Sequence, residues 1–136
     1  MRFEFWKEAL HNHSLNMMNV VYPIKKCVSI WVGTFADEEQ MNDCMDKLIE
    51  PSLELSGPMS AISEVSLEAD AMPLRQLLEG FSGWRTFIDT ASRAGVNLGI
   101  ETANGALVCY YLSCDAPVDF WSGIKFLGSF EGQDVT

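Results

Sequence analysis

Residues 28–50 read VSIWVGTFADEEQMNDCMDKLIE, and this stretch decides the predicted fold. Its first part, residues 28–35, is rich in β-branched and aromatic side chains, which is typical of a buried strand. A turn follows at Ala36-Asp37, and we expect one of these two residues to cap a helix. Apolar side chains then recur with helical spacing and predict one buried face: Met41, Cys44, Met45, Leu48 and Ile49. The stretch therefore predicts a strand that leads into an amphipathic helix.

The opposite face of the predicted helix is acidic. Four carboxylates fall on it at helical spacing: Glu39, Asp43, Asp46 and Glu50. The formal net charge of the chain is −10, and residues 37–70 hold ten acidic residues against one basic residue, Lys47. Because phosphate contacts need lysine and arginine, this charge argues against direct binding of nucleic acid. It favours either a partner protein with a basic surface or an acidic face that only keeps the protein in solution.

The composition is that of a globular protein. Of the 136 residues, 48% are hydrophobic and 21% are charged, which suits one domain with a buried core. No apolar run approaches the roughly 20 residues of a membrane helix, and the early acids Glu4 and Glu8 are unlike a signal peptide. We therefore expect a cytosolic protein without membrane contact. Its cysteines are expected to be reduced thiols, not disulfides or zinc ligands: Cys27, Cys44, Cys109 and Cys114.

The whole pattern predicts an α+β domain with a small mixed sheet of three or more strands and helices packed on one face. Besides the first strand, strands are expected at residues 64–68, 107–112 and 124–130. Pro73 is expected to open a short helix, and a second helix is expected to end at Gly95. Asn104-Gly105 has the composition of a hairpin turn.

Three segments are expected along the chain. Residues 26–130 form the predicted single domain. Residues 1–25 contain several asparagines that argue against a long helix, and we expect an N-terminal extension of uncertain order there. Residues 131–136 form a polar tail that is expected to fray.

The sequence contains no constellation that predicts catalysis. No serine lies in a nucleophile-elbow pattern, and no glycine-rich loop has the spacing that cradles a phosphate. His11 and His13 lie in the N-terminal extension, and their spacing does not fit a metal site. The carboxylates lie on a solvated face, without apolar neighbours to raise their pKa values. A pair of carboxylates that acts as in a glycosidase stays open as an alternative. We therefore predict no catalytic residue, no metal and no cofactor.

Two aromatic positions each allow two interpretations. Trp31, on the predicted strand, is either a core side chain packed under a helix or part of a partner-binding patch. Phe120 and Trp121 lie in a predicted loop beside Asp115 and Asp119, and they form either a binding hot spot or a small separate core. The loop position favours exposure, so we name Phe120 and Trp121 as candidate partner contacts.

Several short motifs, taken together in this order, resemble the bacterial immunity protein 22 family. They are VSIWVGTF at residues 28–35 followed by DEE at 37–39, LLEGFS at 77–82, YYL at 110–112 and IKFLGSF at 124–130. The resemblance covers about residues 26–130. It implies an antidote protein that binds a cognate toxin domain and blocks it, and it carries over no catalytic residue.

The resemblance implies a role for the acidic face as a candidate inhibitory surface. We expect Glu39, Asp43, Asp46 and Glu50 to occupy the cationic cleft of a toxin such as a nuclease, aided by Phe120 or Trp121. Two other functions stay open. One is a general interaction or adaptor domain, and the other is a small ligand-binding domain or hydrolase with a pocket between the sheet and the helices.

Overall fold

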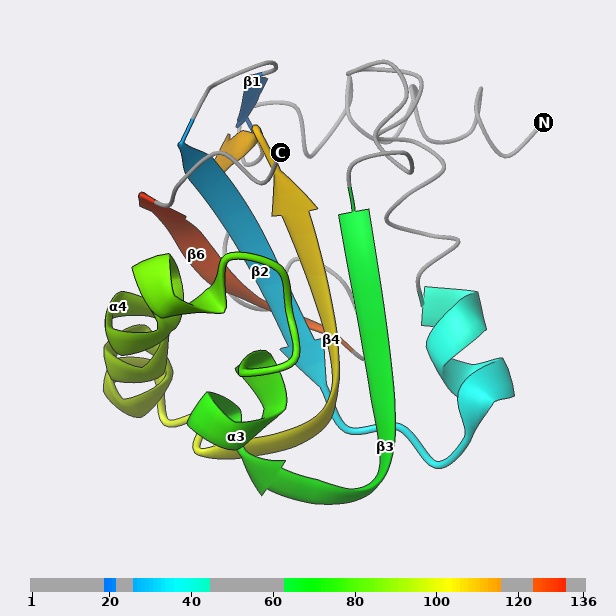
Figure 1. Cartoon of the computed structure of the whole chain (residues 1–136). Helices are drawn as coiled ribbons and strands as arrows, with labels where there is room; N and C mark the ends of the chain where they lie inside the picture. Colours follow the sequence, from blue (N-terminus) through cyan, green and yellow to red (C-terminus); the bar gives the residue numbers. More distant parts are fainter. Residues whose placement is uncertain (1–18, 22–25, 45–62, 116–123, 132–136) are drawn as a thin grey trace, which may run out of the picture.

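The computed structural model describes residues 19–21, 26–44, 63–115 and 124–131. A four-stranded sheet in the order β3-β4-β2-β6 forms its centre (Figure 1). The strands are β2 (Cys27–Gly33), β3 (Ser63–Pro73), β4 (Thr102–Tyr110) and β6 (Lys125–Glu131). A small second sheet pairs β1 (Asn19–Val21) with β5 (Ser113–Asp115). The helices are α3 (Leu74–Leu78) and α4 (Trp84–Leu98), and residues 38–44 are also helical. The predicted α+β class is confirmed.

The central strands β2 and β4 are buried on both faces of the sheet. Ile30 of β2 belongs to the core cluster that also contains Leu78 of α3 and Phe87 of α4. The next residue, Trp31, points to the opposite face, because side chains alternate along a strand. There it is fully buried against the ring of Phe126, with 4.9 Å between ring centroids. Trp31 is therefore a core side chain, but on the face away from α3 and α4.

All four strands of the main sheet pair antiparallel, whereas the sequence predicted a mixed sheet. The connection from β3 to β4 gives the reason. Pro73 pairs with Thr102, and the N–H of Leu74 donates to the carbonyl oxygen of Glu101 at 3.2 Å. The chain therefore leaves for α3 and α4 and returns from them at the same end of the sheet (Figure 1). A parallel pair would need a crossover to the opposite end.

Gly95 does not end the second helix as predicted. α4 continues to Leu98, and Gly99 ends it in the left-handed conformation with φ at +76°. The N–H of Ile100 then donates to the carbonyl oxygen of Gly95 at 2.8 Å and closes the helix C-terminus. Gly95 instead permits close packing, because a Cβ there would overlap the side chain of Leu74 and the carbonyl oxygen of Ile100.

Asn104 and Gly105 lie inside β4 and do not form the predicted hairpin turn. The side chain of Asn104 is buried and bonds to the backbone of Phe35 through both of its polar atoms. A Cβ on Gly105 would lie 2.8 Å from the ring of Phe35. The Asn-Gly composition therefore serves a contact with a distant segment, and local turn preferences carry no information about such a contact.

Two of the predicted segment boundaries also shift. β1 lies within the predicted N-terminal extension and pairs antiparallel with β5, from Asn19 opposite Asp115 to Val21 opposite Ser113. β6 ends at Glu131, the first residue of the predicted polar tail. Long-range pairing decides both ends, and a three-residue strand leaves no periodic pattern in the sequence from which to predict it.

Replacing Gly95 by alanine is expected to destabilise the protein. In an exposed helix this change stabilises by about 0.5–1 kcal/mol. Here the new methyl group meets Leu74 and the carbonyl oxygen of Ile100, and overpacking costs about 1–3 kcal/mol. Gly80→Ala is the control, because nothing lies within 4 Å of the Cβ position there. Urea unfolding curves should show a loss for Gly95→Ala only, and equal curves for the two variants would contradict the packing argument.

Candidate functional site

The acidic helix begins at a well-defined cap. The carbonyl oxygen of Asp37 accepts the N–H of Met41 at 3.2 Å, and its carboxylate accepts the N–H of Gln40 at 2.9 Å. In return, the side-chain oxygen of Gln40 accepts the N–H of Ala36 at 2.6 Å. Asp37 is therefore the N-cap, as one of the two predicted alternatives placed it. The cap fixes the direction in which the first acidic turn leaves the sheet.

Asn104 anchors the segment that leads into this helix. Its Oδ1 accepts the N–H of Phe35 at 2.7 Å, and its Nδ2 donates to the carbonyl oxygen of Phe35 at 2.7 Å. The side-chain amide thus replaces a backbone partner for Phe35, which lies just beyond the end of β2. A Cβ on Gly105 would touch Phe35 and, at 3.2 Å, Met41. Since Gly105 shares the Trp31 face of the sheet, the 38–44 helix packs on the face opposite α3 and α4.

The described residues include two of the six predicted partner contacts. Glu39 and Asp43 are exposed and lie one helical turn apart. The other four lie outside the described residues: Asp46, Glu50, Phe120 and Trp121. Met41, between the two acids, is buried. The predicted division of this helix into an apolar and an acidic side therefore holds where the structure describes it.

Acidic residues of β3 lie on the face of the sheet away from the acidic helix. Leu67 of β3 pairs with Gly105, the same glycine that contacts Phe35 and Met41. Glu68 and Asp70 are exposed, and by strand alternation they share the face of Glu64 and Ser66 instead. We define the acidic surface as the exposed carboxylates of the helix and its cap: Asp37, Glu38, Glu39 and Asp43. The negative charge of residues 37–70 is therefore divided between the two faces of the sheet.

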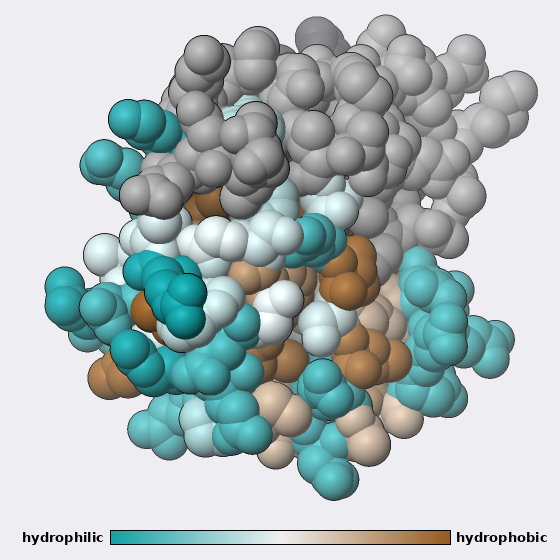
Figure 2. Space-filling view, in the orientation of Figure 1, coloured by the Kyte–Doolittle hydropathy of each residue, from teal (hydrophilic) through white to brown (hydrophobic). Residues whose placement is uncertain are grey.

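Figure 2 shows how hydrophilic and hydrophobic side chains divide one face of the molecule. Hydrophilic side chains gather at the right of the view, where Figure 1 places the 38–44 helix. A strip of hydrophobic side chains runs along β3 between them and the hydrophilic side chains over α3 and α4. Val65 of β3 is 51% exposed and is one of three large hydrophobic side chains exposed in the described part of the chain.

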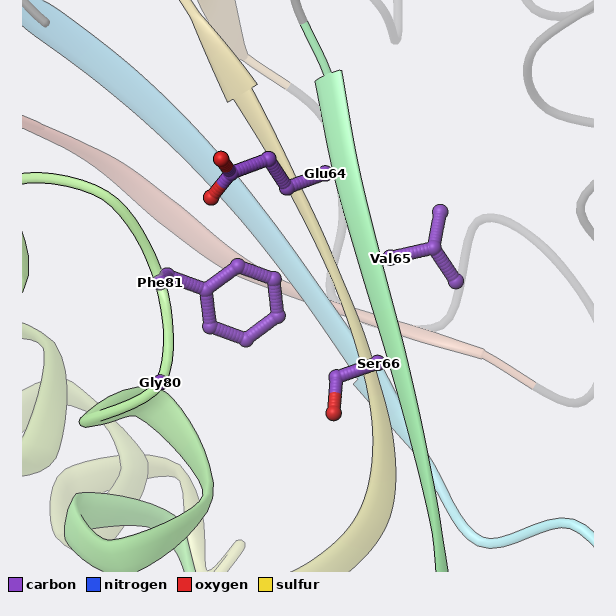
Figure 3. A pocket seen from close by; sticks show the side chains of 5 residues that line it. All are labelled: Glu64, Val65, Ser66, Gly80 and Phe81. Atoms are coloured by element: carbon purple, nitrogen blue, oxygen red, sulfur yellow. The ribbon is translucent and has the colours of Figure 1, made fainter.

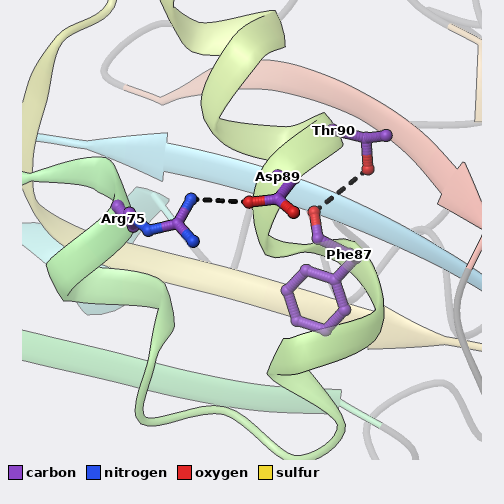
Figure 4. A network of polar contacts seen from close by, with 4 residues as sticks. All are labelled: Arg75, Phe87, Asp89 and Thr90. Atoms are coloured by element: carbon purple, nitrogen blue, oxygen red, sulfur yellow. Dashed lines mark hydrogen bonds and ion pairs between the residues drawn. The ribbon is translucent and has the colours of Figure 1, made fainter.

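The described arginines lie on the helical layer instead. The three arginines that the structure describes are all on α3 and α4: Arg75, Arg85 and Arg93. Arg75 Nη1 lies 2.7 Å from Asp89 Oδ1 (Figure 4). Both side chains of this ion pair are more than half exposed, so it contributes little to stability. The described arginines therefore lie away from the acidic helix.

A second polar cluster lies on the other face of β3, where Glu64 meets the segment between α3 and α4. Glu64 Oε1 accepts the N–H of Ser82 at 2.8 Å and the O–H of Tyr110 at 2.8 Å. Glu64 Oε2 accepts the hydroxyl of Ser82 at 2.6 Å. The Tyr110 oxygen also lies 2.9 Å from the carbonyl oxygen of Ser82, but its single proton suits the charged carboxylate better. Three donors therefore hold one carboxylate.

These contacts shift the two pKa values in opposite directions. Burial acts to raise the pKa of Glu64, but the hydrogen bonds from Ser82 and Tyr110 outweigh it and lower that pKa. Burial raises the pKa of Tyr110, and the adjacent Glu64 carboxylate raises it further. A general base at neutral pH needs a raised carboxyl pKa, and a general acid needs a lowered phenol pKa. The cluster therefore suits recognition of positive charge better than proton transfer.

A pocket of about 460 Å³ opens beside this cluster. Its lining residues are Glu64, Val65, Ser66, Gly80 and Phe81. Figure 3 shows the Glu64 carboxylate, the Ser66 hydroxyl and the Phe81 ring on the same side of β3, and Val65 on the other. The pocket thus lies between the sheet edge and the helical layer. The sequence leaves open a pocket between the sheet and the helices but does not locate it, because the lining comes from two segments that the fold brings together.

The four cysteines form no disulfide bond with one another, and Cys109 and Cys114 are buried. Burial, with a smaller effect of Asp115, raises the pKa of Cys114 to about 12, so this thiol is unreactive at neutral pH. Within the described ranges, no three histidine, cysteine or acidic side chains are grouped so that they could hold a metal ion.

The chain matches no family model, no curated protein and no solved structure. Within the residues that the structure describes, no helix is long and apolar enough to cross a membrane. A functional proposal therefore depends on the chemistry of the acidic surface and of the Glu64 cluster, together with the motifs noted in the sequence.

Replacing Asn104 by leucine is expected to loosen the junction between β2 and the acidic helix. The substitution keeps the volume but leaves the N–H and the carbonyl oxygen of Phe35 without their partner. A buried polar group without a partner costs about 1–3 kcal/mol. Asn97→Leu, on the exposed side of α4, is the matched control. Chemical denaturation should show the loss at position 104 alone, and a loss of the same size at position 97 would argue against the junction.

Replacing Tyr110 by phenylalanine is expected to raise the pKa of Glu64, because it removes one of three donors to the carboxylate. Since the folded pKa of Glu64 lies below the ordinary value, its contribution to stability is present above that value and is lost as the pH falls through the folded pKa. The variant should therefore reduce the pH-dependent contribution of Glu64 to the free energy of unfolding. An NMR titration of the Glu64 carboxyl carbon measures the change, and an unaltered pKa would show that Tyr110 is not a significant donor.

Proposed function

We propose that this chain is a non-enzymatic inhibitor that binds a protein toxin domain through its acidic surface, in the manner of the immunity proteins that its motifs resemble. The observation that carries the proposal is a set of exposed carboxylates fixed to a packed core. Asp37 caps the helix, Asn104 holds the segment before it, and Met41 packs against Gly105. Rigid presentation matters, because an interface that is already ordered loses less entropy on binding.

The state of these carboxylates supports a binding role. None of the four members of the acidic surface has an ion-pair partner in the described part of the chain, so their charges are available to an external partner. A solubility role alone would not require capping and close packing beneath the charges. A concentrated field of one sign also accelerates association with a surface of the opposite sign.

The charge also indicates the class of toxin. A nuclease binds phosphates through lysine and arginine side chains, so its active-site cleft is cationic. Exposed carboxylates on a rigid helix match such a cleft and would exclude the nucleic acid from it. The motif resemblance adds the toxin-antidote setting and a cytosolic site of action, and the acidic surface adds the reason for the inhibition. The adaptor alternative shares the acidic surface but predicts no inhibited activity.

The proposal is tested by recovering the tagged chain from cells of its own source at low and at moderate salt and identifying what binds to it. The expected partner is a basic toxin domain, bound in stoichiometric amount and released by salt. Adding the purified chain to that partner should abolish its toxic activity. A stable partner whose activity the chain does not change would overturn the inhibitor proposal and favour an adaptor.

Reversing the charges of Glu39 and Asp43 to lysine is expected to slow association with the toxin about tenfold or more at low salt, and less at high salt. The double variant retains a like-charge pair one turn apart, but a lysine at position 39 in the first turn opposes the helix dipole at a cost of about 0.3–1 kcal/mol. Glu131→Lys is the control, because Glu131 is exposed on β6 at the opposite edge of the sheet. Stopped-flow kinetics, with melting temperatures as a check of folding, measure the effect. Equal association rates for both variants would remove the acidic helix from the interface.

A further inference from the structure

The Glu64 carboxylate is held in one orientation beside the pocket. Oε1 already accepts two hydrogen bonds, from the N–H of Ser82 and the O–H of Tyr110. Oε2 accepts one, from the hydroxyl of Ser82. A carboxylate oxygen has two lone pairs, so Oε2 retains the capacity for one more donor. Since its three donors come from the same molecule, the carboxylate is oriented before any ligand arrives.

The pocket offers three kinds of contact around this charge. Ser66 lies two residues after Glu64 on β3, so both side chains lie on the same face of the strand, and Figure 3 shows them on either side of the Phe81 ring. The Ser66 hydroxyl makes no hydrogen bond to the residues that the structure describes and is available as an acceptor. At Gly80 the Cβ position has nothing within 4 Å, which leaves this wall open. A negative charge and a hydroxyl therefore face one space, and Phe81, which is 4% exposed, offers a small part of its ring there.

We propose that this pocket binds the guanidinium group of an arginine side chain that a partner protein presents, with Glu64 as its counter-charge. The identification of the partner as a toxin rests on the proposed function. The binding of a guanidinium group by this pocket does not depend on it. A guanidinium is planar and carries five N–H donors, so it can donate to Glu64 and to Ser66 at once. It also stacks on aromatic rings and is more weakly hydrated than an ammonium group.

Charge and the number of polar groups separate this ligand from others. A volume of about 460 Å³ accommodates a guanidinium with part of its aliphatic stem. The ionised carboxylate repels phosphate and other anions. One carboxylate and one hydroxyl are too few ligands for a calcium or magnesium ion without many retained waters. An arginine side chain uses the charge, the hydroxyl and the ring together.

The test titrates Nα-acetyl-arginine amide into the isotope-labelled full chain and follows the amide resonances. We expect saturable shifts at Ser66, Gly80 and Phe81, with a dissociation constant on the order of 1–10 mM. The neutral isostere Nα-acetyl-citrulline amide is the matched control ligand and should give no saturable shift. Glu64→Gln keeps the size and one acceptor oxygen but removes the charge, and it should weaken binding at least about tenfold.

A second variant guards against a structural effect at Glu64. Ser66→Leu fills the pocket and leaves the Glu64 cluster intact, so it should also abolish the shifts while the remaining spectrum is preserved. Equal shifts with citrulline, or unchanged binding in both variants, would overturn the site. Tighter binding of free L-arginine than of the capped amide would overturn its assignment to a protein side chain. Because the isolated chain is used, failure here leaves the inhibitor proposal standing, and failure of toxin inhibition leaves the arginine site standing.

Discussion

The pairing of β2 with β4 supports every other feature of the structure. Six residue pairs run from Val28 opposite Tyr110 to Gly33 opposite Gly105, and both strands are buried on both faces. One end of this ladder holds Asn104 and Gly105, which anchor the acidic helix. The other end holds Tyr110, whose hydroxyl fixes Glu64. Both candidate binding features are thus attached to opposite ends of the same buried strand.

In this arrangement the rigid interior of the sheet and the charged side chains occupy different parts of the molecule. Because the interior of the sheet is apolar and close-packed, the carboxylates lie at its margins, where water solvates them. The acidic helix packs on the Trp31 face and Glu64 lies toward α3 and α4 on the other. A partner that reaches around the β3 edge could therefore meet two kinds of negative site. One is a broad field that accelerates encounter, and the other is a single oriented carboxylate that favours a specific side chain.

Sequence patterns predicted the elements where local periodicity and burial agree. Residues 28–35 gave the central strand because β-branched and aromatic side chains fill a buried sheet, and Asp37 gave the helix cap. The same reasoning failed at Asn104-Gly105 and at Gly95, where residues with strong local preferences serve tertiary contacts. Gly95 accepts Leu74 from another helix, and Asn104 substitutes for a backbone partner. Of the candidate contacts, only Glu39 and Asp43 fall within the described residues, where both are exposed.

The sequence by itself determined the α+β class, the apolar and acidic sides of the helix after Asp37, and the concentration of negative charge between residues 37 and 70. These follow from side-chain type and spacing, which are local properties. The tertiary structure alone decided that the strands are antiparallel, that Glu68 and Asp70 lie on the face away from the acidic helix, and that Glu64, Ser82 and Tyr110 meet beside a pocket. The members of that cluster are 18 and 28 residues apart in sequence at the closest. The pairing of β3 with β4 brings Glu64 beside Tyr110, and the packing of the segment between α3 and α4 on the sheet adds Ser82.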